Sequence, residues 1–255
     1  MSQPLEKVRE DVSVRTRPRP VARINPRPAA PVLAAIAPVR VDAFAEAKQA
    51  FQSKSWFLSV KRCFDIVVAI LALIALSPLL ALIAVAIAAT SKGPVLFKQK
   101  RLGRDNIPFT LYKFRSMYVE RQDLSGIAHT VERDPRITKV GHFIRRGYID
   151  ELPQFINVLK GDMSIVGPRA QVMGMRAVGV CYEELVPNYR ARHAVRPGIT
   201  GLAQVRGFRG EIKDAEHAVA RVDADLEYIY RANLWLDVKI VALTIPSVML
   251  GRVRC

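Results

Sequence analysis

Residues 66–89, IVVAILALIALSPLLALIAVAIAA, form an uninterrupted apolar stretch that decides the architecture of the chain. The stretch carries no charged residue, and Ser77 and Pro78 alone break its aliphatic and alanine composition. At about 1.5 Å per residue, a continuous helix of this length measures about 36 Å and would cross the roughly 30 Å hydrocarbon core of a bilayer. The stretch therefore predicts a membrane helix.

Two features of the same stretch fit a helix that dips into the membrane and returns. Pro78 lies at the middle, where it removes a backbone hydrogen bond and bends a helix, and Ser77 can satisfy the freed carbonyl. Each half is then about 18 Å long, too short to cross the bilayer. Lys61 and Arg62 precede the stretch and Lys92 follows it, so a spanning helix would export one positive flank. The residues alone leave a spanning and a re-entrant helix open.

The composition of the whole chain limits the classes of function. The 255 residues, enough for one domain with a tail, include 39 Lys and Arg against 23 Asp and Glu, yet 50% are hydrophobic. A net charge of +16 favours an anionic partner: a nucleic acid, an anionic lipid or a phosphorylated ligand. The apolar stretch and the lack of a nucleic-acid-binding motif disfavour a nucleic acid. Three cysteines without CxxC spacing exclude a disulfide framework, and four histidines without an HExxH pattern disfavour a zinc hydrolase.

The chain divides into three predicted parts. Residues 1–55 are predicted to be a disordered basic tail, because prolines alternate with arginines, as in residues 17–20 (RPRP), and no apolar period is present. Residues 39–54 fit a short helix at the end of this tail. Residues 56–91 are predicted to hold the membrane helix. Residues 92–255 are predicted to be a globular domain, which the family resemblance given below implies is catalytic and faces the cytosol.

The catalytic part is predicted to be mostly helical with a small sheet. Residues 95–97 and 109–112 fit the strands of a hairpin. Residues 138–160 carry apolar side chains at steps of three and four, which predicts two helices, one ending near Gly147 and one starting near Asp150. Residues 234–250 fit either a helix that lies on a membrane surface or a C-terminal core helix.

The adjacent carboxylates Asp150 and Glu151 are the candidate catalytic residues. Acidic residues at the start of a helix also serve as caps, so the pair alone fits a structural role as well. Basic residues of the kind that bind phosphate lie around the pair in sequence: Lys113, Arg115, Arg145, Arg169 and Arg196. In such surroundings a carboxylate stays ionised and can attack phosphorus, and a second carboxylate can hold Mg²⁺.

Six short motifs follow one another through this part of the chain. They are residues 113–117 (KFRSM), 134–138 (DPRIT), 150–154 (DELPQ), 157–164 (NVLKGDMS), 166–169 (VGPR) and 196–202 (RPGITGL). Together they resemble the bacterial sugar transferase family, the monotopic phosphoglycosyl transferases, and the resemblance extends from about residue 61 to about residue 250. The resemblance implies an α+β fold with one re-entrant membrane helix, bent at Ser77 and Pro78, and amphipathic helices that lie at the membrane surface.

The resemblance also implies a reaction. Such enzymes transfer a sugar 1-phosphate from a UDP-sugar to undecaprenyl phosphate, release UMP, require Mg²⁺ and pass through a covalent phosphosugar–aspartyl intermediate. The family's nucleophile matches Asp150, its metal-associated glutamate matches Glu151, and its phosphate-binding arginine matches Arg145. The family's Pro-Arg and Pro-Gly motifs, expected near the nucleotide, match Pro168 with Arg169 and Pro197 with Gly198.

The donor sugar and the partners are expectations of the same kind. The short segment before the membrane helix resembles hexose 1-phosphate transferases that begin exopolysaccharide synthesis, which favours galactose or glucose. An N-acetylated amino sugar, a UDP-sugar hydrolase and a non-catalytic membrane scaffold stay open. Tyr148, Ala170 and Ala203 depart from residues common in the family. The expected partners are a UDP-sugar, undecaprenyl phosphate, lipids of the bacterial inner membrane and downstream glycosyltransferases, with no nucleic acid.

Overall fold

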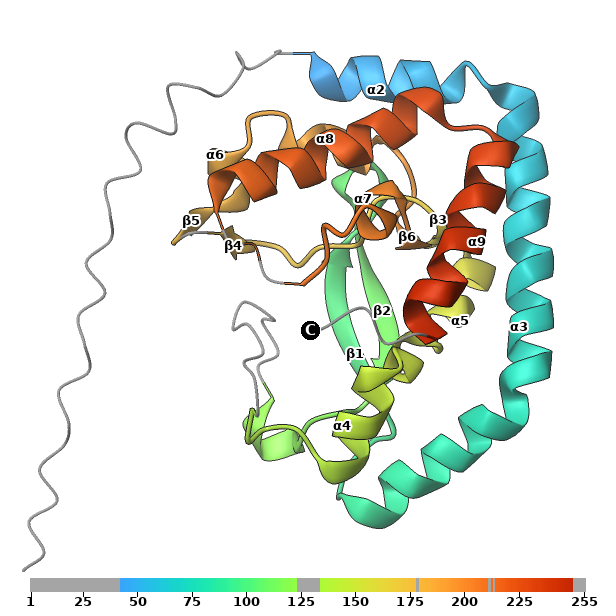
Figure 1. The fold of residues 1–255 in the computed structure, drawn as a ribbon, viewed down its shortest axis with the longest axis vertical. Coiled ribbons are helices and arrows are strands. Elements are labelled where there is room, and N and C mark those ends of the chain that lie inside the picture. Colours follow the sequence, from blue (N-terminus) through green and yellow to red (C-terminus); the bar gives the residue numbers. More distant parts are fainter. Residues whose placement is uncertain (1–41, 123–133, 178, 211, 213, 250–255) are drawn as a thin grey trace, which may run out of the picture.

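A computed structural model describes residues 42–122, 134–177, 179–210, 212 and 214–249 of the chain (Figure 1). Its helices are α2 (Ala43–Gln52), α3 (Ser55–Thr90), α4 (Lys139–Arg146), α5 (Gln154–Lys160), α6 (Tyr182–Leu185), α7 (Leu202–Val205), α8 (Ala215–Arg231) and α9 (Leu234–Met249). Its strands are β1 (Leu96–Leu102), β2 (Pro108–Phe114), β3 (Ser164–Val166), β4 (Arg176–Ala177), β5 (Val180–Cys181) and β6 (Gly198–Thr200). Short 3₁₀ segments are η1 (Arg104–Asn106), η2 (Val119–Arg121), η3 (Ile149–Glu151) and η4 (Tyr189–Ala194). The predicted mostly helical α+β fold is confirmed.

Helix α3 is long and apolar enough to cross a membrane, and within the described residues it alone meets that standard. Figure 1 shows it as one ribbon that changes direction near its middle, where Pro78 lies inside the helix. Pro78 cannot donate a hydrogen bond to the carbonyl of Ile74, four residues earlier. Ser77 Oγ donates to that carbonyl over 2.8 Å. The Ser77 hydroxyl therefore replaces the backbone donor that Pro78 lacks, as the sequence predicted.

Both halves of α3 pack on the same folded domain. In the first half, Asp65 is buried and accepts hydrogen bonds from Ser164 Oγ over 3.0 Å and from the Ile165 amide over 2.9 Å. In the second half, Ile83 and Ile87 join a buried cluster with residues of β2 and α4. The opposite side of α3 carries exposed aliphatic side chains: Val67, Ile70, Leu71, Ile74, Leu82 and Val85.

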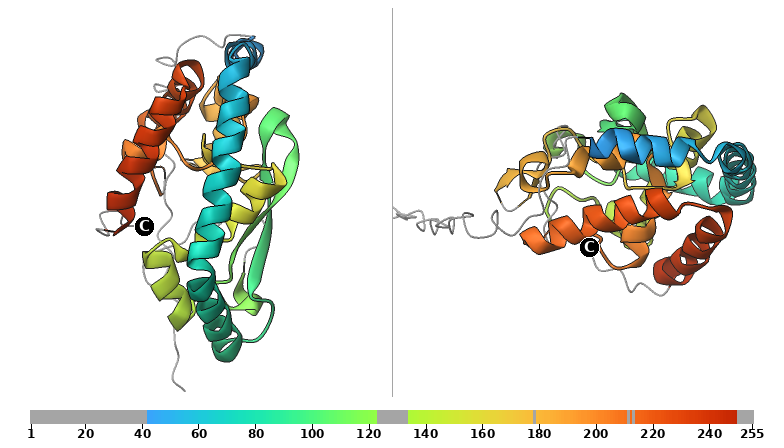
Figure 2. Two further views of the ribbon diagram at one scale, coloured as in Figure 1. Left: turned by 90° about the vertical axis from the view of Figure 1, so that its right-hand side faces the viewer. Right: turned by 90° about the horizontal axis from the view of Figure 1, so that it is seen from above.

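Helix α9 is fastened to α3 by buried polar contacts. Lys61 Nζ of α3 lies 2.7 Å from Asp237 Oδ2 of α9, and Tyr228 of α8 donates its hydroxyl to Asp237 Oδ1 over 2.8 Å. The left view of Figure 2 shows α3 in front, with α9 on one side and the β1–β2 hairpin on the other. Asp237 is fully buried, whereas Trp235 of the same helix is exposed. Helix α9 thus has one face in the core and one face outside.

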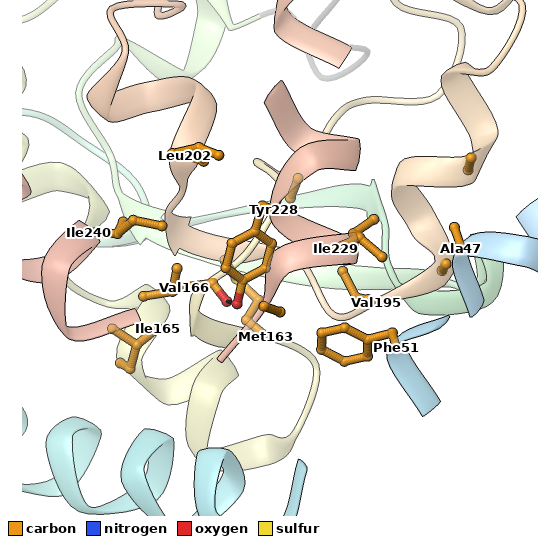
Figure 3. Close-up of a cluster of buried hydrophobic side chains, with 14 of the residues drawn as sticks. Ala47, Phe51, Met163, Ile165, Val166, Val195, Leu202, Tyr228, Ile229 and Ile240 are labelled. Atoms are coloured by element: carbon orange, nitrogen blue, oxygen red, sulfur yellow. Dashed lines mark hydrogen bonds between the residues drawn. The ribbon is translucent and has the colours of Figure 1, made fainter. Parts of the chain in front are cut away.

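The sheets are small, and each brings distant segments together. Strands β1 and β2 form an antiparallel hairpin in which Phe97 pairs with Lys113. Strands β3 and β6 pair in parallel, and the backbone beyond β3 lies close to the start of β6. A Cβ atom on Gly198 would lie 2.1 Å from the Gly167 amide nitrogen, so only glycine permits this approach. Around these strands lies the main core cluster, which includes Met163, Val166 and Tyr228 (Figure 3).

The structure changes two details of the predicted organisation. Residues 1–41 of the predicted tail 1–55 lie outside the described residues, but α2 is folded and buries Ala47 and Phe51 in the main core. Helix α2 matches the short helix predicted within residues 39–54, and apolar residues at helical spacing give it a face to bury in the core. The segment predicted to begin a helix near Asp150 is instead the 3₁₀ turn η3, and α5 starts after Pro153.

Candidate active site

The carboxylate pair lies on a short turn between two helices. Thr138 caps the start of helix α4, where its Oγ1 accepts a hydrogen bond from the Gly141 amide over 2.8 Å, and Gly147 follows the last residue of the helix. Tyr148 then adopts a left-handed backbone conformation with φ of 54°. Such a conformation is strained for a tyrosine and indicates that the surrounding structure fixes it. The reversal starts η3, which carries Asp150 and Glu151.

Both carboxylates line a cavity of about 430 Å³. The cavity is built by β1, β2, α4, η3, the segment after β3, β6, α7, α8 and α9. The basic side chains that line it are Arg101, Lys113, Arg136, Arg145, Arg169, Arg209 and Arg221, against the two acidic ones of η3. This excess of positive charge around two carboxylates suits a ligand with several negative charges, such as a diphosphate.

Asp150 is buried at the wall of this cavity. Burial raises the pKa of its carboxyl to about 6, and the neighbouring charge of Glu151 acts in the same direction. Lys113, Arg145 and Arg169 act in the opposite direction. The side chain is therefore mostly ionised at neutral pH but poorly solvated, and both properties favour a nucleophile.

Glu151 is held in a different state by Arg169. The two Arg169 guanidinium nitrogens donate to the two Glu151 carboxylate oxygens, one of them over 3.0 Å. Burial raises the pKa of Glu151, but the charge and hydrogen bonds of Arg169, with Lys113 and Arg101, outweigh it and hold the pKa below its usual value. Two adjacent carboxyl groups thus have pKa values moved in opposite directions, which is typical of a pair with different chemical roles.

Lys113 and Arg145 line the same cavity as Asp150, and their charges act on its carboxyl. Burial lowers the pKa of Lys113 to about 8, and the nearby charge of Asp150 partly offsets this effect. Arg145 Nη1 lies 3.3 Å from Ser116 Oγ, which orients the guanidinium within the cavity. The structure therefore brings together five predicted site residues: Lys113, Arg145, Asp150, Glu151 and Arg169.

Pro168, Pro197 and Gly198 do not line the cavity, but they shape the segment that carries Arg169. The Gly198 amide donates to the Pro168 carbonyl over 2.9 Å, and Arg169 forms an isolated bridge with Gly198. Their backbone contacts fix the direction in which Arg169 leaves the β3–β6 pair. Ser77 and Pro78 lie at the bend of α3.

The structure places Arg115 and Arg196 away from this cavity. The Arg115 guanidinium is buried and donates to the Ser91 carbonyl over 2.7 Å, so it caps the C-terminal end of α3. Arg196 Nε donates to the Gly161 carbonyl over 2.9 Å and lines a second, smaller cavity of about 150 Å³. Both arginines thus bond to backbone carbonyls at helix ends, and the structure does not bring them to the cavity of Asp150 and Glu151.

Several cavity residues were not predicted from sequence. Arg101 follows Phe97 and Gln99 at every second position of β1, and all three line the cavity. That period-two pattern was the signal available for Arg101. Gln171, Gln204 and Arg221 come from separate segments, and no local pattern marks them.

The role of Arg192, which holds the backbone of Arg169, was not predicted from sequence either. Arg192 Nη2 donates to the Arg169 carbonyl over 2.9 Å and is paired with Asp225. This pair holds the backbone from which Arg169 reaches Glu151. Arg192 and Asp225 lie 33 residues apart in sequence, so their pairing had no signal in the chain.

The donor set fits a magnesium ion that arrives with a diphosphate. Among the described residues no three His, Cys, Asp or Glu side chains gather as a metal site. Mg²⁺ with phosphate ligands needs only one or two protein carboxylates, because phosphate oxygens and waters complete its octahedron. Glu151 is kept ionised at the cavity and, although Arg169 occupies both oxygens, each oxygen has a further lone pair.

Comparison with known proteins adds an independent finding. A family model described as bacterial sugar transferase matches residues 56–251. An exopolysaccharide production protein, PSS, of Rhizobium leguminosarum bv. phaseoli is 50% identical over 190 residues, which cover 74% of this chain and 95% of that protein.

Two further relatives are longer than this chain. An undecaprenyl-phosphate glucose phosphotransferase of Komagataeibacter xylinus is 49% identical over 77% of this chain and 37% of its own length. A UDP-glucose:undecaprenyl-phosphate glucose-1-phosphate transferase of Escherichia coli (strain K12) is 50% identical over 73% of this chain and 39% of its own length. The chain therefore spans less than half the length of these two proteins.

Proposed function

The chain belongs to the bacterial sugar transferase family, and we propose that it transfers a hexose 1-phosphate from a UDP-hexose to undecaprenyl phosphate and releases UMP. The names of two relatives support glucose as the hexose. The observation that carries the proposal is the buried Asp150, which faces a cavity with Lys113, Arg145 and Arg169. In a family of phosphoglycosyl transferases this arrangement supplies a nucleophile and the groups that neutralise a diphosphate.

The reaction proceeds by two displacements at one phosphorus atom. An oxygen of ionised Asp150 attacks the phosphorus that carries the sugar, a new oxygen–phosphorus bond forms, and the phosphoanhydride bond to UMP breaks. An oxygen of undecaprenyl phosphate then attacks the same phosphorus and releases Asp150 as a carboxylate. One phosphoanhydride replaces another, so the transfer needs no separate energy source. Positioning and charge neutralisation provide the rate enhancement.

The basic side chains have separable tasks in this scheme. Lys113 and Arg145 flank Asp150 and hold the phosphate under attack, while Arg169 keeps Glu151 ionised and in place. Glu151 is the residue that would hold Mg²⁺. The ion would neutralise charge on the diphosphate.

The membrane arrangement is part of the proposal. We place α3 as a re-entrant helix of a monotopic protein of the bacterial inner membrane, with the catalytic domain on the cytosolic side. Both halves of α3 pack on this one domain, and its outer side is aliphatic. Exposed Trp56 and Trp235 lie in the first turns of α3 and α9, at the end where Lys54 bonds to the Ala232 carbonyl, and both fit the headgroup region. The site then meets the lipid phosphate at headgroup height.

Topology is tested with two cysteines that flank α3. Ser53→Cys and Lys92→Cys are each introduced into a variant in which the native cysteines are replaced, and intact spheroplasts are treated with a membrane-impermeant maleimide. A re-entrant helix leaves both sites unlabelled until the membrane is opened. Labelling of one site in intact spheroplasts would show a spanning helix.

The reaction is tested by UMP release. The full chain in nanodiscs receives Mg²⁺, undecaprenyl phosphate and one UDP-sugar from a panel of hexose and N-acetylhexosamine donors. UMP that depends on the lipid and forms with UDP-glucose or UDP-galactose is the expected result, and the lipid product is the substrate for downstream glycosyltransferases. UMP without lipid would show a hydrolase. No UMP from a folded protein with any donor would favour a non-catalytic scaffold.

A further inference from the structure

Two glutamines of the cavity carry amide groups that no described residue satisfies. Gln171 Nε2 and Gln204 Oε1 are both buried without a hydrogen-bond partner in the described part of the chain. The two residues are 3% and 8% exposed, and both line the cavity that holds Asp150. A buried polar group without a partner destabilises a protein by about 1–3 kcal/mol. Two such groups in one cavity are therefore available as hydrogen-bonding groups to a ligand that enters it.

Gln204 is fixed as a hydrogen-bond acceptor. Its Nε2 donates to the Ile199 carbonyl over 3.1 Å, which leaves Oε1 as the atom without a partner. Its own carbonyl accepts from Arg209 Nε over 2.7 Å, so the backbone of α7 is held at this point as well. The acceptor therefore stands on a rigid support at the cavity wall.

Gln171 presents a donor close to the carboxylate pair. It follows Arg169 by two positions, in the segment that leads from the Arg169–Gly198 bridge to the backbone contact with Leu102. Both Arg169 and Gln171 line the cavity, and the Gln171 carbonyl accepts from the Leu102 amide over 2.9 Å. Two residues of chain span at most about 7 Å. The backbone of Gln171 therefore lies within about 7 Å of that of Arg169, which pairs with Glu151.

The chemistry of the two amides differs from that of the other cavity residues. Arginine and lysine suit phosphate oxygens, whereas a neutral donor and a neutral acceptor suit hydroxyl groups, which donate and accept. The sugar is bonded directly to the phosphorus that Asp150 attacks, while the uracil lies beyond the second phosphate and the ribose. We propose that Gln171 and Gln204 form the subsite that binds the hydroxyl groups of the donor sugar. This inference rests on the proposed function.

The test is a binding experiment on the full chain in nanodiscs. Gln171→Leu and Gln204→Leu keep the side-chain volume and remove the amide. Each variant and the wild type are titrated calorimetrically with UDP and with UDP-glucose or UDP-galactose, whichever binds the wild type more tightly. The Kd for the UDP-sugar is expected to rise roughly 5- to 30-fold in each variant, as for loss of a buried hydrogen bond. The Kd for UDP is expected to change less than about twofold, because UDP lacks the sugar.

Gln122→Leu is the matched control. Gln122 is also a cavity-lining glutamine, but its Nε2 already donates to the Met117 carbonyl over 3.1 Å. We expect its substitution to weaken neither ligand. Equal weakening of UDP and UDP-sugar by Gln171→Leu and Gln204→Leu would assign the amides to the uridine diphosphate and overturn the sugar subsite. Unchanged binding of both ligands would overturn it too.

Two further measurements distinguish a sugar-binding role of these glutamines from a purely structural one. The melting temperature of ligand-free Gln171→Leu is expected to equal or exceed that of the wild type, because an unpaired buried amide is removed. A purely structural glutamine would instead lower the melting temperature. The second measurement is UMP release by the wild type, because the calorimetric Kd does not depend on turnover. If the variants lose UDP-sugar binding selectively but the wild type releases no UMP, the sugar subsite is supported and the transferase reaction is rejected.

Discussion

Replacing Asp150 by asparagine is expected to abolish UMP release and, at the same time, to stabilise the ligand-free protein. Burial raises the pKa of this carboxyl from 3.8 to about 6. The folded state therefore prefers the protonated carboxyl, and the ionised form opposes folding above about pH 6. Asparagine resembles the neutral acid in shape and lacks the charge, so it removes this opposition while it removes the nucleophile.

The magnitude follows from the two pKa values. At about 1.4 kcal/mol per pH unit, a pKa raised from 3.8 to about 6 corresponds to about 3 kcal/mol at neutral pH. The destabilisation builds up as the pH rises from the unfolded value through the folded one and is constant above it. By linkage the advantage of Asp150→Asn is about 3 kcal/mol at pH 7.5, about half of that at pH 5, and small below pH 4. For a chain of this size we expect a melting temperature about 6–12 °C higher at pH 7.5.

The assay is thermal unfolding in nanodiscs at pH 7.5 and pH 5, without nucleotide, beside UMP release at pH 7.5. Glu184→Gln, a neutralised carboxylate on the exposed side of α6, is the control and is expected to change neither melting temperature by more than about 1–2 °C. A melting temperature for Asp150→Asn that is equal to or below the wild-type value at pH 7.5 would refute the electrostatic reasoning. An advantage that is the same at both pH values would show that charge is not its cause. Wild-type turnover by Asp150→Asn would reject the nucleophile.

Three other outcomes are expected. The pH profile of kcat/KM should be bell-shaped, falling below about pH 6 as Asp150 takes up a proton and above about pH 8 as Lys113 loses one; Lys113→Arg should remove the alkaline fall and keep the acidic one. Removal of divalent cations with EDTA should abolish UMP release, and Mg²⁺ should restore it, while the melting temperature of the ligand-free protein stays the same; unchanged activity would exclude the metal. Asp237→Asn should destabilise the fold by about 3–5 kcal/mol because it leaves buried Lys61 with Asp65, 3.9 Å away, as its remaining ionic partner, and Lys61→Met with Asp237→Leu should recover much of this loss; a double variant no more stable than the single one would contradict that account.

The sequence predicted those features whose causes are local. The composition of residues 66–89 predicted the long apolar helix α3, and Ser77 and Pro78 predicted both its bend and the hydrogen bond that compensates it. The loop between β1 and β2 predicted the hairpin. The ordered motifs predicted Asp150 and Glu151 as site residues, and the structure places both at one cavity with Lys113, Arg145 and Arg169.

The sequence failed where the cause is a contact between distant segments. Arg115 follows Lys113 by two positions, so a strand that continued through both residues would place both side chains on the same side. Strand β2 ends at Phe114, however, and Arg115 turns to the end of α3, where it donates to the Ser91 carbonyl. Only Lys113 of the two lines the cavity. Gln171 and Gln204 were missed because an amide without a partner is visible only when its surroundings are known.

Helix α9 contacts both α3 and the cavity that holds Asp150, and a polar residue of α9 lies at each contact. At one end, Asp237 pairs with Lys61 of α3 and accepts from Tyr228. Beyond the middle of the helix, Thr244 lines the cavity and its hydroxyl lies 2.7 Å from that of Thr200, on the strand that leads to α7. A shift of α9 along α3 would thus move the cavity wall. Apolar contacts alone would tolerate such sliding, whereas the directional polar contacts at Asp237 and Thr244 fix α9 in one register. The packing of α9 against α3 and the shape of the cavity that holds Asp150 are therefore linked through one helix.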